Sequence, residues 1–363
     1  MSLAIGMRSM MHCSASSISP AISHRDAFEA VHDVIKELNG ATLVNYEAIK
    51  KGGNNAVYRL MYSDHGQYAL KIYPPLFIDS RNRLNAEFRA LSFLHQQGET
   101  QVPVPIKALE EQNVGIYRWI AGESVQQVKN HDIDSALKFM SRLHGYKGHR
   151  AAKTLAFASE AYRSYGEAKQ QLQQRWRRLY QQAQPATELK DFLDRRYKPS
   201  EQILLDYLEK QRLVRADKSK AYLTLSPSDF GFHNAIKPPD GELVFVDLEY
   251  FGWDDPAKLI ADFLWHPGMV LSETLKHQFV AGAVTIYGEN DLLNRFKTLY
   301  VLCGLRWCLI MLNEFLPDGR AKRRLSGKMD SHSDPELLSQ QLRKAEENLD
   351  RLLSTYEQNP YAN

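Results

Sequence analysis

The spacing of hydrophobic residues changes several times along the first third of the chain. Apolar residues recur at helical spacing over 26–38, which predicts a helix that stops at Asn39-Gly40. Three short segments follow at 42–49, 56–62 and 67–73, separated by turns that contain Gly, Asn and Asp. This pattern predicts three antiparallel strands joined by hairpins.

Helical spacing returns over 80–97, where Leu84, Phe88, Leu91 and Leu94 fall on one stripe. The proline-rich sequence at 102–105 then breaks the helix. Two further strands are expected at 106–110 and 114–120.

From about residue 132 onward the hydrophobic pattern is mostly helical, with one β-rich island at 222–247. The expected helices are 132–145, 155–184, 188–213, 255–265, 271–287, 291–314 and 334–356. We therefore expect an α+β chain with the bilobal layout of the protein-kinase-like fold. The predicted N-terminal lobe covers 26–120 and the helical lobe covers 121–363, which includes a helical insertion at 147–220.

Composition narrows the function classes without choosing one. The chain is 44% hydrophobic and 25% charged, which is typical of a globular protein, and a net charge of +3 gives no reason to expect nucleic acid. No apolar run free of charges reaches the roughly 18 residues of a membrane span, so no membrane is expected. Only three cysteines occur, which favours a reducing cytoplasm, and residues 1–25 are interpreted as a flexible leader.

Two N-terminal features are suited to binding phosphate. The segment Lys51-Gly52-Gly53-Asn54-Asn55-Ala56 lies between two predicted strands, where glycines let backbone N–H groups approach a phosphate, although an ordinary hairpin has the same composition. Lys71 lies within a predicted strand, and Glu87 borders the apolar stripe of the next helix. A strand lysine held by a helix glutamate is the arrangement that kinases use on the phosphates of ATP.

Two C-terminal features are suited to proton transfer and metal binding. Asp229 and Asn234 are five residues apart, the spacing of the kinase catalytic loop, in which the aspartate meets the substrate hydroxyl and the asparagine binds magnesium. Asp247 follows a predicted strand 13 residues after Asn234, and Glu249 comes two residues later. One hairpin between them would bring Asn234 and Asp247 together, and Glu249 could reach either metal or substrate.

With these residues together, the chain resembles the aminoglycoside phosphotransferase and choline kinase superfamily. Its catalytic loop usually reads H-G-D-x-x-x-x-N, which 227–234 follows in part, and its metal segment I-D-x-E-Y-x-x-x-x-D-P matches 246–256. The resemblance implies ATP and Mg²⁺ as cofactors, with Asp229 as catalytic base. It also implies that Asn234 and Asp247 bind Mg²⁺, that Lys71 and Glu87 lie at the ATP phosphates, and that the stretch 117–123, with Tyr117 and Trp119, meets adenine.

Two departures from the family pattern stand out. The usual histidine of the catalytic loop is replaced by Pro227, so other contacts must hold that loop. The aspartate expected three residues after Pro256 is replaced by Leu259, with Asp262 nearby. Both indicate a divergent branch of the family.

The expected activity is transfer of the γ-phosphate of ATP to a hydroxyl of a small molecule. The alternative is a catalytically inactive, kinase-like protein that binds nucleotide or a partner. A protein kinase fits less well, because H-R-D and A-P-E signatures are missing. The acceptor is left open between an amino alcohol, a sugar and an aminoglycoside. Four aromatic residues could cage a quaternary ammonium group, although such residues also form cores: Tyr250, Trp253, Trp265 and Trp307.

Overall fold

The computed structural model describes most of the chain. The described residues are 24–49, 55–183, 187–211, 222–239, 241–288, 291–325 and 335–361. The predicted leader 1–25 lies almost wholly outside these ranges, and so do Gly52 and Gly53 of the predicted phosphate loop.

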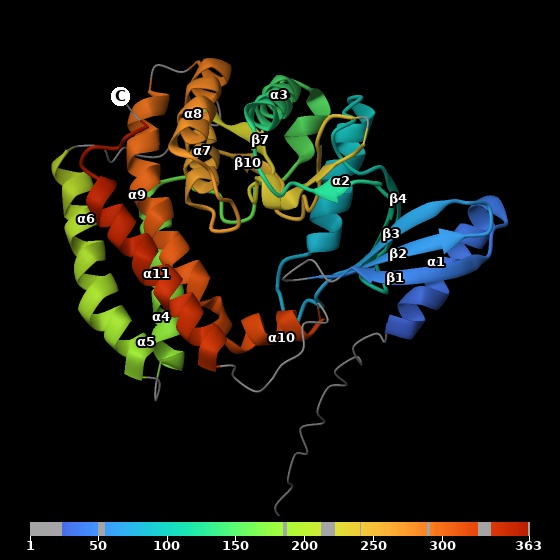
Figure 1. Cartoon of the computed structure of the whole chain (residues 1–363), viewed down its shortest axis with the longest axis horizontal. Coiled ribbons are helices and arrows are strands. Elements are labelled where there is room, and N and C mark those ends of the chain that lie inside the picture. The colour runs from blue at the N-terminus through green and yellow to red at the C-terminus, as the bar shows by residue number, and fades with distance from the viewer. Residues whose placement is uncertain are drawn as a thin grey trace, which may run out of the picture.

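The N-terminal lobe is a five-stranded antiparallel sheet covered on one face by a helix (Figure 1). The strand order is β1 (Leu43–Ile49), β2 (Ala56–Tyr62), β3 (Gln67–Ile72), β5 (Val114–Arg118) and β4 (Pro105–Leu109). Helix α1 (His24–Asn39) buries Val31 and Ile35 against Leu60 and Ile116 of the sheet. It ends at Gly40, whose φ of 71° suits a residue without a Cβ atom. The strands and hairpins predicted for this lobe are confirmed.

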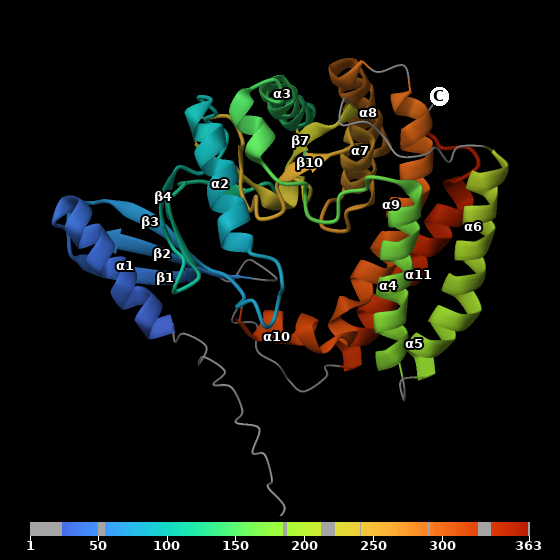
Figure 2. The ribbon, with the colours of Figure 1, turned by 180° about the vertical axis from the view of Figure 1, so that it is seen from behind.

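Helix α2 (Arg83–Gln96) lies between this sheet and the larger lobe (Figure 2). Asn82 caps its start, because its side chain accepts a hydrogen bond from the N–H of Asn85. The helix buries Leu84, Leu91 and Leu94 together with Glu87, so a carboxylate is carried into the boundary between the lobes.

The C-terminal lobe is mainly helical and is built around α9 (Leu292–Met311), which packs against α7, α11 and α4 (Figure 1). The other helices are α3 (Asn130–Tyr146), α4 (Tyr165–Gln182), α5 (Thr187–Asp191), α6 (Lys198–Lys210), α7 (Pro256–Trp265), α8 (Glu273–Tyr287), α10 (Pro317–Leu325) and α11 (Pro335–Thr355). This α+β bilobal layout agrees with the sequence-based expectation.

Two small sheets accompany the helices of the C-terminal lobe. One has the order β6, β8 and β9, and the other pairs β10 with β7. Their bounds are β6 (Glu123–Ser124), β7 (Thr224–Ser226), β8 (Ala235–Lys237), β9 (Val244–Phe245) and β10 (Gly252–Asp254). The loops that follow β7 and β9 carry the candidate catalytic residues.

The helix predicted for 155–184 is wrong in its first part, since α4 begins only at Tyr165. The preceding segment runs alongside β10, where the N–H of Ala158 donates to the carbonyl of Trp253 at 3.0 Å. Gly252 permits this approach, because a Cβ at that position would lie 2.4 Å from the nitrogen of Ala158. Docking against a strand therefore overrides the local helical spacing.

Among the described residues, one helical stretch passes a length and composition test for a membrane span. This stretch, Leu292–Phe315, has a mean hydropathy of 1.3, and 72% of its apolar window is buried in the fold. The core helix of a globular protein passes the same test, and α9 occupies that position here.

Candidate active site

Lys71 is surrounded by three carboxylates, one from α2 and two from the loop that follows β9. Its Nζ lies 2.6 Å from Oε2 of Glu87, 2.5 Å from Oδ1 of Asp247 and 3.6 Å from Oε2 of Glu249. Burial alone would lower the pKa of Lys71, but Asp247, Glu87 and Glu249 together raise it well above its ordinary value. The predicted Lys71–Glu87 ion pair is confirmed, and the surrounding carboxylates favour the charged form of the lysine.

Glu87 is held by more than the lysine. The hydroxyl of Tyr73 donates to Oε2 of Glu87 at 2.6 Å, and the N–H of Leu248 donates to Oε1 at 3.1 Å. The hydroxyl of Tyr117 lies 2.6 Å from that of Tyr73, and burial raises the pKa of the Tyr117 phenol. The side chain of Tyr117 thus belongs to this buried network.

Glu249 is deeply buried and joins the candidate phosphate loop to the site. Its Oε2 accepts a hydrogen bond from Nδ2 of Asn55 at 2.7 Å, and its Oε1 is ion-paired with Arg83. Burial, and then the nearby charge of Asp247, raise the pKa of Glu249 to about 7. Asn55 therefore ties the described end of the loop to the carboxylate cluster.

Oxygen atoms of Glu87, Asp247 and Glu249 all lie within 4.8 Å of one another. Asp247 is the open member of this group, since its side chain is 32% exposed. Its backbone has a φ of 66°, a left-handed conformation that costs energy for a residue with a Cβ atom and is common at functional sites. Carboxylate oxygens are the ligands that Mg²⁺ prefers, so the donor set fits this ion.

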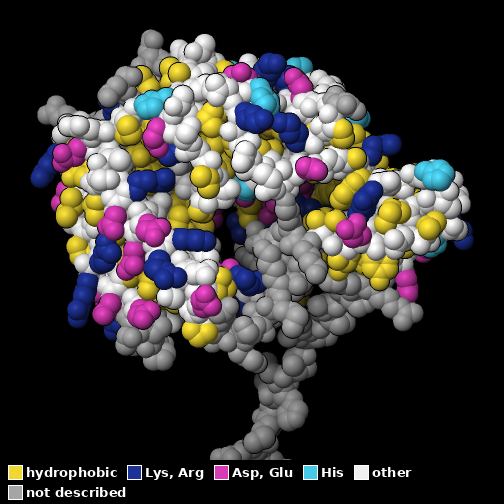
Figure 3. Space-filling model, viewed as in Figure 1, with side chains coloured by type: hydrophobic (Ala, Val, Ile, Leu, Met, Phe, Trp, Pro, Cys, Tyr) yellow, Lys and Arg dark blue, Asp and Glu magenta, His cyan; other side chains and the backbone are white. Residues whose placement is uncertain are grey.

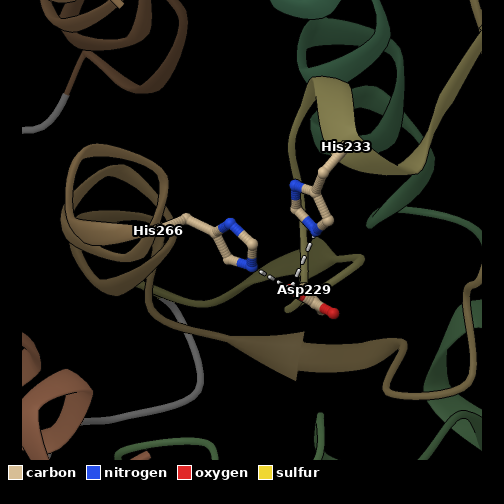
Figure 4. A group of neighbouring side chains, drawn as sticks. All are labelled: Asp229, His233 and His266. Atoms are coloured by element: carbon tan, nitrogen blue, oxygen red, sulfur yellow. Dashed lines mark hydrogen bonds and ion pairs between the residues drawn. The ribbon is translucent and has the colours of Figure 1, made fainter. Parts of the chain in front are cut away.

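Asp229 accepts hydrogen bonds from two histidines on one oxygen (Figure 4). Its Oδ1 lies 3.3 Å from Nε2 of His233 and 3.2 Å from Nε2 of His266. The tautomer of His266 is fixed, because its Nδ1 accepts the N–H of Gly268 at 3.0 Å, so its Nε2 carries the proton.

These contacts determine the ionisation of Asp229. Burial alone would raise its pKa, but the hydrogen bonds from His233 and His266 hold the pKa of that carboxyl well below its usual range. Burial lowers the pKa of His266, against the opposing effect of Asp229. Asp229 is therefore an anion held by imidazole N–H donors.

Asn234 connects the two halves of the site. Its Nδ2 donates to the backbone oxygen of Asp229 at 3.1 Å, and its own backbone oxygen accepts the N–H of Val246 at 2.8 Å. Since Val246 immediately precedes Asp247, the loop that carries the candidate base lies beside the strand end that carries the candidate metal ligand. The juxtaposition predicted from the hairpin between Asn234 and Asp247 is present.

The chain passes from β5 to β6 through the predicted adenine-binding stretch 117–123. The backbone N–H of Trp119 donates to the carbonyl of Gln67 at 3.1 Å, and the guanidinium of Arg59 lies 5.1 Å from the centre of the Trp119 ring. The backbone of this stretch links the two lobes, and adenine recognition there stays a prediction.

A cleft of about 840 Å³ opens beside Asp229, in the hollow between the lobes (Figure 3). Charged side chains of both signs line it, among them Arg81, Arg175, Arg178, Arg306, Glu160, Asp262, Glu314 and Asp318. Glu160, Arg175 and Arg178 belong to the helical insertion predicted at 147–220.

The four aromatic residues considered for an ammonium cage do not gather at one place. Tyr250 and Trp307 line the cleft, whereas Trp265 is buried beneath Arg351, whose guanidinium lies 4.0 Å from its ring centre. Trp253 donates its indole N–H to the carbonyl of Ala152. Their core interpretation holds for Trp253 and Trp265.

Sequence reasoning missed several residues of the site. His233 lies within the quoted catalytic loop, and the replacement of the usual histidine by Pro227 was a signal that another histidine would hold Asp229. His266 and Tyr73 carry no such signal, because only the fold brings them to Asp229 and Glu87.

Comparison with known proteins identifies a family and similar folds. The model of the phosphotransferase enzyme family matches residues 45–292. The choline kinase LicA from Streptococcus pneumoniae has a similar structure, with a TM-score of 0.57 and 15% identity over 91% of this chain and 100% of the other. A spectinomycin phosphotransferase with bound ADP and spectinomycin has a TM-score of 0.59 and 15% sequence identity. The match covers 91% of this chain and 98% of the other. An ethanolamine kinase from Plasmodium vivax has a TM-score of 0.53 and 15% sequence identity. The match covers 88% of this chain and 83% of the other.

No curated protein sequence matches the chain. The family model nevertheless covers more than half of it and spans Lys71, Glu87, Asp229 and Asp247. The chain therefore belongs to the phosphotransferase enzyme family, and it is a small-molecule phosphotransferase.

Proposed function

We propose that the protein transfers the γ-phosphate of ATP, with Mg²⁺, to a hydroxyl group of a small molecule bound beside Asp229. The observation that carries the proposal is the position of Lys71, which is ion-paired with Glu87 and Asp247 next to the loop of Asp229 and Asn234. Phosphoryl transfer needs positioning and charge stabilisation more than covalent help from the protein, and this arrangement supplies both.

Lys71 would bind the phosphates of ATP, with Glu87 fixing its direction through an ion pair of 2.6 Å. Asp247 and Asn234 would hold Mg²⁺, and Glu249 lies close enough to contribute an oxygen. When bound, Mg²⁺ would neutralise charge on the phosphates. We place adenine at the backbone of 117–123, where the chain crosses between the lobes.

Asp229 would orient the acceptor hydroxyl and receive its proton. The hydroxyl oxygen bonds to the γ-phosphorus, the bond from that phosphorus to the β–γ bridging oxygen breaks, and ADP leaves. Because hydrogen bonds from His233 and His266 keep Asp229 ionised, its carboxylate can accept a hydrogen bond from the hydroxyl at the start of the reaction.

Calorimetric titration with Mg-ATP tests the proposal. The wild-type protein should bind Mg-ATP, and Lys71→Ala should weaken that binding about tenfold or more, because a charge-assisted bond to phosphate is lost. Lys107→Ala is a matched control, since Lys107 is an exposed lysine on β4 of the same sheet. Absence of binding at millimolar Mg-ATP would contradict the proposal. Binding without turnover of any hydroxyl compound would favour the inactive alternative.

A further inference from the structure

Three arginines surround one carboxylate in the wall of the cleft. Arg175 is ion-paired with Glu160, and the guanidinium nitrogens of Arg81 and Arg306 lie 3.7 and 3.9 Å from the oxygens of Glu160. The three arginines come from the loop before α2, from α4 and from α9, so distant parts of the chain converge here. Glu160 itself has a φ of 62°, a strained conformation that is common at functional sites.

The carboxylates around this cluster already have cationic partners. Asp262 is ion-paired with Arg306 and lies 2.9 Å from Nζ of Lys258, while Asp79 is ion-paired with Arg81 and Arg83. At the outer part of the cleft, Arg178 lies 2.9 Å from Asp318. These acids are therefore occupied and are poorly placed to recognise a positively charged ligand.

The arginines of this cluster, in contrast, have N–H donors that make no hydrogen bond to the described residues. A guanidinium has five N–H groups, and within the described part of the chain Arg175 donates one hydrogen bond, to Glu160. Arg306 is 4% exposed, and its buried Nε has no acceptor among the described residues. The side chain of Arg175 is 19% exposed and lines the cleft, so a ligand that brings oxygen acceptors could accept hydrogen bonds from its remaining N–H groups.

The aromatic face that could bind a cation is also occupied by arginine. The guanidinium carbons of Arg81 and Arg83 each lie 5.0 Å from the centre of the Tyr250 ring, and the indole N–H of Trp307 donates to Asp262 at 3.1 Å. A quaternary ammonium at Tyr250 would meet two positive charges. Choline and ethanolamine, which give two of the structural neighbours their names, are both cations.

We propose that the acceptor is anionic: a hydroxyl compound that carries a carboxylate or phosphate group bound by Arg175 and Arg306, with its hydroxyl at Asp229. This inference rests on the proposed phosphotransferase function and names the substrate class of the same site. The cleft of about 840 Å³ is large enough for a sugar acid or a sugar phosphate. Arginine suits such groups because its planar fork binds carboxylate and phosphate oxygens in pairs.

Matched acceptors test the inference, with ATP turnover by the full chain as the readout. The neutral compounds glycerol and glucose are compared with glycerate, glycerol 3-phosphate, glucuronate and glucose 1-phosphate, and with cationic choline, ethanolamine and kanamycin. At least one anionic compound should be turned over about tenfold faster or more than its neutral counterpart. Comparison of glycerate and glucuronate with glycerol 3-phosphate and glucose 1-phosphate shows whether the site prefers a carboxylate or a phosphate group.

Arg175→Gln should raise KM for the anionic acceptor about tenfold to a hundredfold while leaving KM for ATP unchanged. Glutamine keeps the helix-forming tendency of α4. Arg177→Gln is the matched control, because Arg177 is an exposed arginine of the same helix and does not line the cleft. A loss of turnover with unchanged KM for the acceptor would instead mean that Arg175 acts on the transferred phosphate, and this would overturn the assignment.

Two further results would overturn the inference while leaving the proposed function intact. One is Mg-ATP binding with turnover of cationic or neutral acceptors in preference to their anionic counterparts. The other is the absence of calorimetric binding of glucuronate and glucose 1-phosphate to protein loaded with Mg-ADP. Failure of the proposed function is distinguishable from both, since it would appear as wild-type protein that does not bind Mg-ATP.

Discussion

The imidazole rings of His233 and His266 stack face to face, with their centres 3.7 Å apart and their planes 7° from parallel. Both rings present Nε2 to the same oxygen of Asp229 (Figure 4). His233 belongs to the catalytic loop, whereas His266 directly follows α7, so the stack joins the loop to a core helix. The pair supplies contacts of the kind that the loop requires once Pro227 replaces the usual histidine.

Removal of His266 should therefore impair catalysis without impairing nucleotide binding. His266→Ala deletes one N–H donor to Asp229 and one face of the stack, so we expect turnover to fall about tenfold while Mg-ATP affinity stays unchanged. His266→Gln, which retains a side-chain N–H, should recover part of the loss. The measurement is single-turnover phosphorylation beside calorimetry, with exposed His149→Ala as control. Equal turnover in wild type and His266→Ala would refute a positioning role.

The local sequence was sufficient to predict the side of the site that contains Lys71 and Glu87. Alternation and hairpin turns defined β1, β2 and β3, and the helical stripe of α2 placed Glu87 opposite the strand lysine. These elements are formed by residues that are close together in the sequence. The spacing of their hydrophobic side chains therefore indicates which face is buried. The pairing of Lys71 with Glu87 follows from two adjacent elements.

The acceptor side could not be predicted in the same way. Residues 155–164 have helical spacing, but 156–158 pair with β10, because Gly252 leaves room for their backbone. The cluster around Glu160 joins arginines that lie 15, 79 and 146 residues away along the chain, at Arg175, Arg81 and Arg306. Such contacts depend on how the helices pack, which periodicity does not specify.

Lys71 should also matter for stability. Lys71→Met leaves three neighbouring carboxylates, those of Glu87, Asp247 and Glu249, without their shared cation, and breaking a buried ion pair costs about 3–5 kcal/mol. Proton uptake by Glu249 will offset part of this cost. Urea denaturation measures the change, and Lys71→Met combined with Glu87→Gln should be less destabilised than the sum of the two single variants. Additive single effects would show that the two residues are not coupled.

The Glu160 cluster predicts a specific sensitivity to acid. Burial would raise the pKa of Glu160, but Arg175, Arg306 and Arg81 lower it to about 2. A lowered pKa stabilises the folded state at pH values above about 4.5, and this stability is lost as the pH falls through about 2. Between pH 7 and pH 3 the contribution of Glu160 should shrink by about 2 kcal/mol.

Glu160→Gln tests whether the contribution of Glu160 to stability decreases as the pH falls, because glutamine does not titrate. The variant should be less stable than wild type at pH 7, and the difference in unfolding free energy should narrow towards pH 3. Glu188→Gln provides the comparison, since Glu188 is an exposed glutamate of α5 in the same insertion. A difference that stays constant from pH 7 to pH 3 would mean that the arginines do not lower the pKa of Glu160.

Asp229 and Asp247 should have separable roles in catalysis and in metal binding. Asp229 is bonded to two histidines and faces the cleft, so Asp229→Asn should leave Mg-ATP affinity nearly unchanged while turnover falls about 10²-fold or more, the usual scale for a lost general base. Asp247 belongs to the carboxylate cluster at Lys71, so Asp247→Asn should weaken Mg-ATP binding together with turnover. Calorimetry at several Mg²⁺ concentrations and single-turnover rates compare the two variants, with exposed Asp191→Asn as control. Identical behaviour of Asp229→Asn and Asp247→Asn would remove the distinction between base and metal ligand, and near-normal turnover in Asp229→Asn would exclude it as the base.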